Sequence, residues 1–131
     1  MNSSNFHPAT EHDEQATLIK WWALQCAHFG IPEHLLHAIP NGGARDPITG
    51  ARLKAEGVRP GIPDLFLAVP RFGHAGLYIE MKRRKGGWTS NEQKAVIDDL
   101  TKQGYACHIC YGWFNAKTTI EQYLTRSSEA P

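Results

Sequence analysis

The stretch GIPDLFLAVPRFGHAGLYIEMK, residues 61–82, carries most of the information about the fold. Residues 64–69 and 77–82 are apolar runs rich in residue types that favour strands. Between them, residues 70–76 contain a proline and two glycines, which are typical of a turn. The stretch therefore predicts two antiparallel strands joined as a hairpin.

Three reactive side chains should converge in this hairpin. Residues two apart on a strand project from the same face, so Glu80 and Lys82 should lie side by side. Asp64 begins the first strand, whose start lies beside the end of its antiparallel partner, so Asp64 should approach Glu80. Two carboxylates and an ammonium group suit phosphodiester hydrolysis, because Mg²⁺ prefers carboxylate and water ligands and a bound ion activates water. Alternatively, Glu80 and Lys82 form an ordinary ion pair on an exposed edge strand.

Helical and strand patterns flank the hairpin on both sides. Thr10 can cap a helix whose apolar residues recur at three- and four-residue spacing as far as Gly30. Ser90 can cap a second amphipathic helix that ends at Gly104. The other predicted elements are a short strand or helical turn over 35–39, a loop over 41–50, a helical turn over 51–56, a strand over 105–111 and a short helix over 116–124.

The composition fits a single domain over residues 1–131, with a core of about residues 10–125 and flexible ends. A chain of 131 residues, 41% of them hydrophobic, can bury one ordinary core. No apolar run approaches the roughly 18 to 20 residues that a membrane span needs. The three cysteines have no disulfide-framework spacing. We therefore expect a soluble, cytoplasmic protein with free thiols.

Basic residues cluster although the formal net charge is only +1. Residues 71–88 hold five arginines and lysines against one acidic residue, Glu80. Such a surface beside an acidic cluster could hold a phosphate backbone next to a metal ion, whereas a plain solvated face is the alternative. Trp88, beside this basic run, could stack on a base or belong to an interface or core edge.

Five ordered motifs resemble one known family. They are Glu11 with Gln15, IPNGG at 39–43, GVRPGIPDLFL at 57–67, IEMK at 79–82 and NEQK at 91–94. Over about residues 10–112 the chain resembles the VRR-NUC domain family of the PD-(D/E)xK nuclease superfamily. One departure is that Pro60 follows Val58 and Arg59, where the name-giving motif has a second arginine.

The resemblance implies a metal site in the hairpin. Asp64 and Glu80 would be ligands for Mg²⁺ or Mn²⁺, together with the backbone carbonyl of Met81. Lys82 would contact the phosphate or the attacking water. The predicted DNA contacts are Asn41, Arg45, Lys54, Arg83, Arg84 and Lys85.

The resemblance also implies roles for two helical residues. Glu11 would add a metal ligand from the first helix, with Glu14 as the competing choice, because residues three apart share a helical face. Either carboxylate could instead simply favour the helix N-terminus. Gln93 would orient Lys82, or would serve only to cap its own helix.

The implied fold is an α/β, restriction-endonuclease-like PD-(D/E)xK core, with a mixed sheet of about four strands flanked by helices. The implied activity is a metal-dependent DNA endonuclease that acts on branched DNA such as four-way (Holliday) junctions. A homodimer would present two active sites. The family resemblance suggests a bacterial cell or a phage-infected host cell. The alternatives are a flap or nonspecific DNA nuclease and a catalytically silent DNA-binding module.

Overall fold

A four-stranded mixed sheet forms the centre of the protein in this computed structural model, which describes residues 8–40 and 46–125. The strands are β1 (Leu36–Ala38), β2 (Leu65–Leu67), β3 (Leu77–Lys82) and β4 (Ala106–Tyr111). They lie in the order β1-β2-β3-β4, with antiparallel β1–β2 and β2–β3 pairs and a parallel β3–β4 pair. The predicted hairpin is confirmed as the β2–β3 pair.

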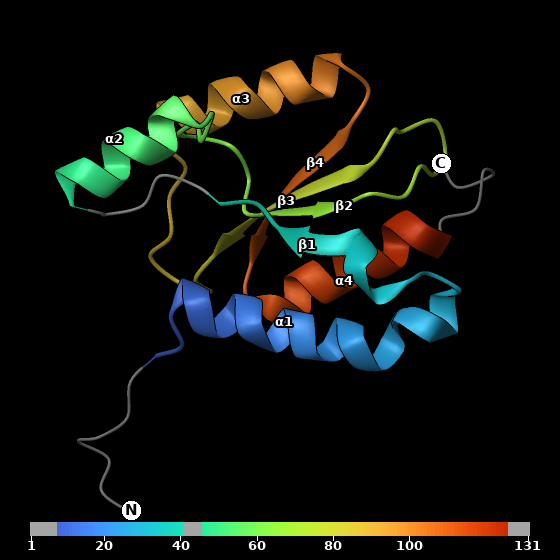
Figure 1. Cartoon of the computed structure of the whole chain (residues 1–131). Coiled ribbons are helices and arrows are strands. Elements are labelled where there is room, and N and C mark those ends of the chain that lie inside the picture. The colour runs from blue at the N-terminus through green and yellow to red at the C-terminus, as the bar shows by residue number, and fades with distance from the viewer. Residues whose placement is uncertain (1–7, 41–45, 126–131) are drawn as a thin grey trace, which may run out of the picture.

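Helices cover both faces of the sheet (Figure 1). They are α1 (Glu11–Gln25), α2 (Pro47–Ala55), α3 (Asn91–Lys102) and α4 (Trp113–Thr125), with the 3-10 turns η2 (Cys26–Phe29) and η3 (Glu33–Leu35). α1 and α4 lie on one face, and α2 and α3 lie on the other. The α/β prediction with about four strands is therefore confirmed. The ambiguous segment 35–39 contains both alternatives, since η3 leads directly into β1.

Two predicted helix boundaries were wrong. α2 begins at Pro47 and not at residue 51, because the Asp46 side chain accepts a hydrogen bond from the Thr49 N–H (2.9 Å) and caps a helix that starts with proline. α4 begins at Trp113 and not at residue 116, because the Trp113 N–H donates to the Glu14 side chain of α1 (2.9 Å). This second cap comes from a residue far away in the sequence.

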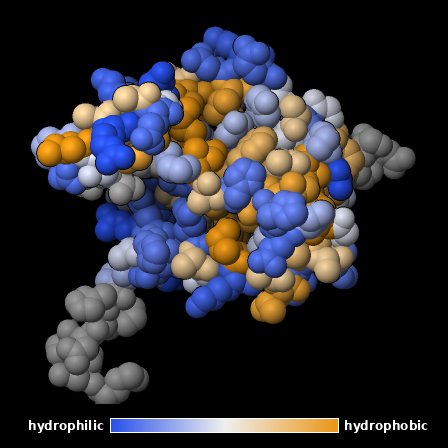
Figure 2. All heavy atoms as spheres, in the orientation of Figure 1, coloured by the Kyte–Doolittle hydropathy of each residue, from blue (hydrophilic) through white to orange (hydrophobic). Residues whose placement is uncertain are grey.

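The hydrophobic core lies between the sheet and the α1–α4 layer. Alternate β3 residues, Leu77, Ile79 and Met81, are fully buried there, and Leu18 and Trp22 of α1 belong to the same cluster. The outer surfaces of the helices are mostly polar, and apolar residues reach the surface mainly between the two helical layers (Figure 2). No helix in the described part of the chain is long and apolar enough to span a bilayer.

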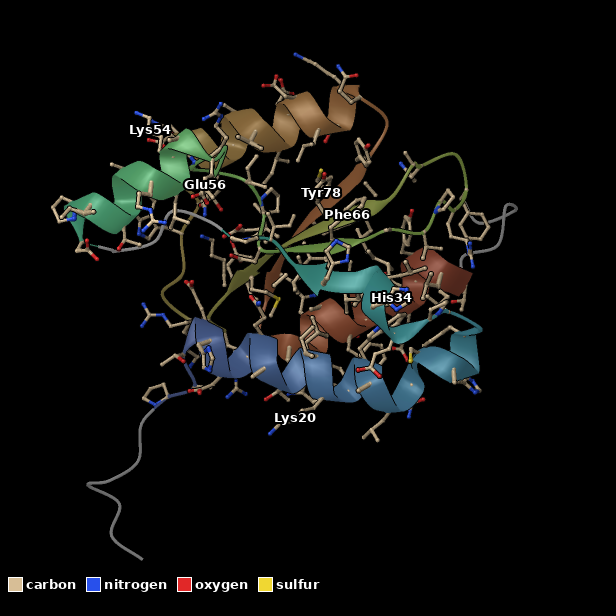
Figure 3. The ribbon with its side chains drawn as sticks, viewed as in Figure 1. Lys20, His34, Lys54, Glu56, Phe66 and Tyr78 are labelled. Atoms are coloured by element: carbon tan, nitrogen blue, oxygen red, sulfur yellow. The ribbon has the colours of Figure 1, made fainter. Side chains whose placement is uncertain are left out.

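The opposite face of the sheet carries the other set of β3 side chains. Strand alternation directs Tyr78, Glu80 and Lys82 towards α3. Tyr78 packs against Phe66 of β2, with 4.4 Å between the ring centroids, and both lie on the α3 side of the sheet (Figure 3). On this face of the sheet, the aromatic side chains are therefore followed along β3 by polar side chains, which face the start of α3.

Candidate active site

The β2–β3 register brings the two predicted carboxylates together. Leu65 pairs with Ile79, so Asp64, one residue earlier, lies opposite Glu80. The Asp64 side chain accepts a hydrogen bond from the Met81 N–H, with 2.7 Å between nitrogen and oxygen. This bond holds the carboxylate at the end of β3, as the hairpin geometry predicts.

Glu80, Lys82 and Gln93 form a buried polar cluster. Lys82 Nζ lies 3.2 Å from Glu80 Oε2 and 3.0 Å from Gln93 Oε1. Gln93 Nε2 donates to the same Glu80 oxygen at 2.8 Å. Glu80 is only 3% exposed and Lys82 only 5%. The alternative of an exposed surface pair is therefore wrong.

Gln93 also takes part in the N-terminal cap of α3, so both predicted contacts of this residue are present. Its Oε1 accepts the Ser90 N–H (3.0 Å), and its own N–H donates to Ser90 Oγ (3.1 Å), which is a complete capping box. One amide oxygen thus receives hydrogen bonds from both the helix cap and Lys82. The start of α3 and the direction of the lysine are coupled through a single side chain.

Burial disfavours the ionised form of both carboxylates, and the charge of Asp64 further disfavours the ionisation of Glu80. Burial and the charge of Asp64 raise the pKa of Glu80 from its ordinary 4.5 to about 7, although Lys82 acts in the opposite direction. Burial likewise raises the pKa of Asp64, partly offset by the hydrogen bond from Met81. The buried Oε1 of Glu80 has no hydrogen-bond partner among the described residues. The cluster therefore has an excess of acceptor oxygens, which a proton or a cation would satisfy.

Glu11 and Glu14 occupy different environments although they share a helix. Glu11, the first residue of α1, lines a pocket of about 310 Å³ that Lys82 and Gln93 also line. Its charge raises the pKa values of Asp64 and Glu80, so it faces the same site. Glu14 is 3% exposed, and its carboxylate binds the Trp113 N–H and Arg84 Nε (3.3 Å). Of the two glutamates, Glu11 has the suitable position, and Glu14 joins α1 to α4.

The donor set fits a divalent cation held in part by water. Asp64 and Glu80 supply two carboxylates at one point, and the Glu80 oxygen that has no partner in the described part of the chain is a suitable ligand for Mg²⁺ or Mn²⁺. Within the described ranges, no group of three or more His, Cys, Asp or Glu side chains is arranged so that it could hold a metal ion, so Asp64 and Glu80 would bind one together with water. The Met81 side chain lies in the core, so only its backbone carbonyl is available as the predicted ligand.

The predicted DNA contacts fall into three groups. Arg83 lines the pocket, and Lys85 is exposed on the same loop. Arg84 is largely exposed, yet its Nε faces Glu14. Lys54 is exposed on α2, where Figure 3 shows it on the outer side of the helix and away from α1. The predicted residues Asn41 and Arg45 lie outside the described residues.

Sequence reasoning missed two residues that shape this site. Ser90, which was predicted only as the cap of α3, also lines the pocket, because its capping-box partner Gln93 contacts Lys82. Gly87 allows the loop after β3 to pass close to Lys82, because an added Cβ would lie 2.9 Å from the lysine Cβ. No local sequence signal marks Gly87, because its closeness to Lys82 depends on the conformation of the loop.

A mixed sheet with paired carboxylates and a lysine at the end of a central hairpin defines an α/β domain of nuclease type. Comparison with known proteins agrees, since the family model for the VRR-NUC domain matches residues 9–113. The chain belongs to the VRR-NUC domain family. A solved structure described as a VRR_NUC domain protein is similar, with a TM-score of 0.77, 29% identity and 90% coverage of each chain. A search of curated proteins gave no match.

Proposed function

We propose that this protein is a divalent-metal-dependent endonuclease that hydrolyses phosphodiester bonds in DNA. The observation that carries this proposal is the convergence of Asp64, Glu80 and Lys82 at one end of β3, with a buried Glu80 oxygen that has no partner among the described residues. The chain also belongs to a nuclease-type domain family, which supports the same chemistry.

The chain's own residues divide the work as follows. Asp64 and Glu80 hold the cation, and Glu11 adds a ligand from the edge of the pocket. Bound Mg²⁺ or Mn²⁺ supplies an activated water and neutralises charge on the phosphate. Lys82 stabilises the additional negative charge of the transition state, because Gln93 and Glu80 hold its ammonium group in one direction before the substrate arrives.

The electrostatic surface supports a nucleic-acid substrate. Arg83 lines the same pocket as Lys82, and Lys85 is exposed on the same loop. A DNA strand whose phosphate contacts Lys82 would therefore have further positive charge beside its neighbouring phosphates. We infer that branched DNA, such as a four-way junction, is the substrate. Because one active site cuts one strand, cleavage of both strands would use a symmetric dimer.

The test is cleavage of labelled four-way junction, flap and linear duplex DNA with Mg²⁺, with Mn²⁺ and with chelator. Wild type is compared with Asp64→Asn and Lys82→Gln, and Lys102→Gln is the control because Lys102 forms an exposed ion pair on α3. We expect both active-site variants to lose at least about 100-fold in rate and the control to retain activity.

Each outcome of this test indicates a different function. Paired, symmetric, metal-dependent nicks in the junction support a junction resolvase, whereas cleavage of one flap arm or of every substrate indicates a flap or nonspecific nuclease. Metal-independent binding without cleavage would indicate a catalytically silent DNA-binding module. Undiminished cleavage by Asp64→Asn would overturn the assignment of the site.

A further inference from the structure

Trp88 is a large aromatic side chain that the fold leaves exposed. It is 74% exposed and lies in the loop between the end of β3 and the start of α3. Within the described part of the chain, its ring has no stacking contact with another aromatic side chain, unlike Trp21, Trp22 and Trp113. It therefore adds little to the core, and the core-edge alternative is not supported.

The indole nevertheless has a defined location, because it lines the same pocket as Lys82 and Gln93. Two features of the loop bring it there. Gly86 has a positive φ of 81°, which favours glycine, and Gly87 lies so close to Lys82 that any side chain would collide. The loop is thus folded back against the lysine, and Trp88 stands at the mouth of the site.

The charges around Trp88 favour a nucleic acid over an apolar partner. Arg83 lines the same pocket, and Lys85 is exposed nearby on the loop. An aromatic ring beside several cations is the combination that binds single-stranded nucleic acids, since the cations hold the backbone and the ring stacks on a base. An apolar peptide would instead have to desolvate these charges.

We propose that Trp88 stacks on a base that lacks a stacking neighbour, next to the phosphate that Lys82 contacts, and so makes the site selective for DNA whose base stacking is interrupted at the cut, as it is at a branch or a flap. This inference rests on the proposed function of the same site. Bases inside a duplex already stack on both neighbours, so an indole at the mouth can reach only a base at a branch, a flap or an end. Trp88 is then a specificity-determining residue, whereas Lys82 and the carboxylates perform the chemistry on any strand.

The experiment measures DNA binding in EDTA, so that no cleavage occurs. Fluorescence anisotropy gives the Kd of a linear duplex and of the same duplex carrying a single-stranded flap. The proteins are wild type, Trp88→Ala and Trp88→Phe, with Phe114→Ala as the control because Phe114 is a 62% exposed aromatic on α4 and does not line the pocket. Thermal melts check that every variant folds.

We expect Trp88→Ala to weaken flap binding by about 5- to 100-fold, the range observed for loss of one base–aromatic stack. Trp88→Phe should restore most of the affinity, and duplex binding should change by less than about 2-fold on removal of a contact that a duplex does not make. An abasic nucleotide at one flap position should weaken wild type by the same factor and should not weaken Trp88→Ala further. Equal losses on duplex and flap, or additive effects of the variant and the abasic site, would overturn the proposal.

Failure of the two proposals can be told apart. If wild type cleaves no DNA with Mg²⁺ or Mn²⁺, the nuclease function fails, whatever the binding results show. If cleavage proceeds with equal preference for flap and duplex, and Trp88→Ala does not change that preference, the inference about Trp88 fails while the nuclease function stands.

Discussion

Replacing Glu80 with glutamine should stabilise the metal-free protein at alkaline pH, although it should abolish activity. The folded protein must keep Glu80 ionised above pH 7 in a buried position beside Asp64, with one carboxylate oxygen unpartnered among the described residues. Glutamine carries no charge, and its carbonyl oxygen can still accept the hydrogen bonds from Lys82 and Gln93. The variant therefore removes an unfavourable charge and retains the favourable contacts.

The pKa of Glu80 sets the magnitude and sign of this effect. A rise from 4.5 to about 7 in the folded state means that wild type loses about 3 kcal/mol of stability as the pH rises through this window. Below pH 4.5 the side chain is protonated in both folded and unfolded states and contributes no difference. Glu80→Gln should thus match wild type near pH 4.5 and should exceed it by up to about 3 kcal/mol at pH 8, or roughly 10 °C in Tm.

The assay is urea denaturation in EDTA at pH 4.5 and pH 8, with Glu121→Gln as the control because Glu121 forms a partly exposed ion pair on α4. The same samples with Mn²⁺ form a second arm, in which wild type should gain stability through binding to the folded state and Glu80→Gln should not. A variant that is less stable than wild type at pH 8 in EDTA would refute this account of Glu80.

Three further predictions concern neighbouring residues. Gln93→Ala should lower the single-turnover cleavage rate by roughly 10- to 100-fold, because it releases the buried Lys82 side chain. It should also lower the free energy of unfolding by about 1 kcal/mol, because it removes part of the α3 cap. An unchanged cleavage rate would contradict the positioning role of Gln93. Gly87→Ala should lower the free energy of unfolding by about 1 to 3 kcal/mol in urea denaturation. Gly50→Ala, in open space within α2, should instead raise it by about 0.5 to 1 kcal/mol. Equal effects of the two substitutions would disprove the close approach of Gly87 to Lys82. Glu14→Ala should destabilise the protein by about 1 to 3 kcal/mol without changing its Mn²⁺ affinity. Glu11→Gln should unfold at the same temperature as wild type but should bind Mn²⁺ at least about 10-fold more weakly by calorimetry. The reverse pattern would exchange the roles of the two glutamates.

Elements whose signals are local were predictable from the sequence. The two apolar runs around a proline- and glycine-containing turn predicted the β2–β3 hairpin, and the spacing of Glu80 and Lys82 predicted that they share a face. The helices capped by Thr10 and Ser90 also begin where their side-chain hydrogen bonds predict. In each case the deciding interaction joins residues close together in the chain.

Boundaries and contacts that depend on distant residues were not predictable in the same way. α4 begins earlier than its apolar pattern indicates, because Glu14 of α1 caps it. The burial of Glu80 and Lys82 depends on α3, which brings Gln93 over the end of β3. From the sequence alone, this pair was also compatible with an exposed edge strand.

The sequence by itself determined the order of elements, the hairpin, and the set of side chains that could perform phosphodiester chemistry, because short-range periodicity and turn residues specify these features. The family resemblance pointed to Glu11 and Gln93, but only the tertiary structure decided that Glu11 faces the pocket while Glu14 joins two helices, and that Gln93 both caps α3 and holds Lys82. The tertiary structure also left Trp88 exposed at the mouth of the site. The physical reason is that burial and partner choice depend on which elements pack together, and residues on one helical face are equivalent until that packing distinguishes them.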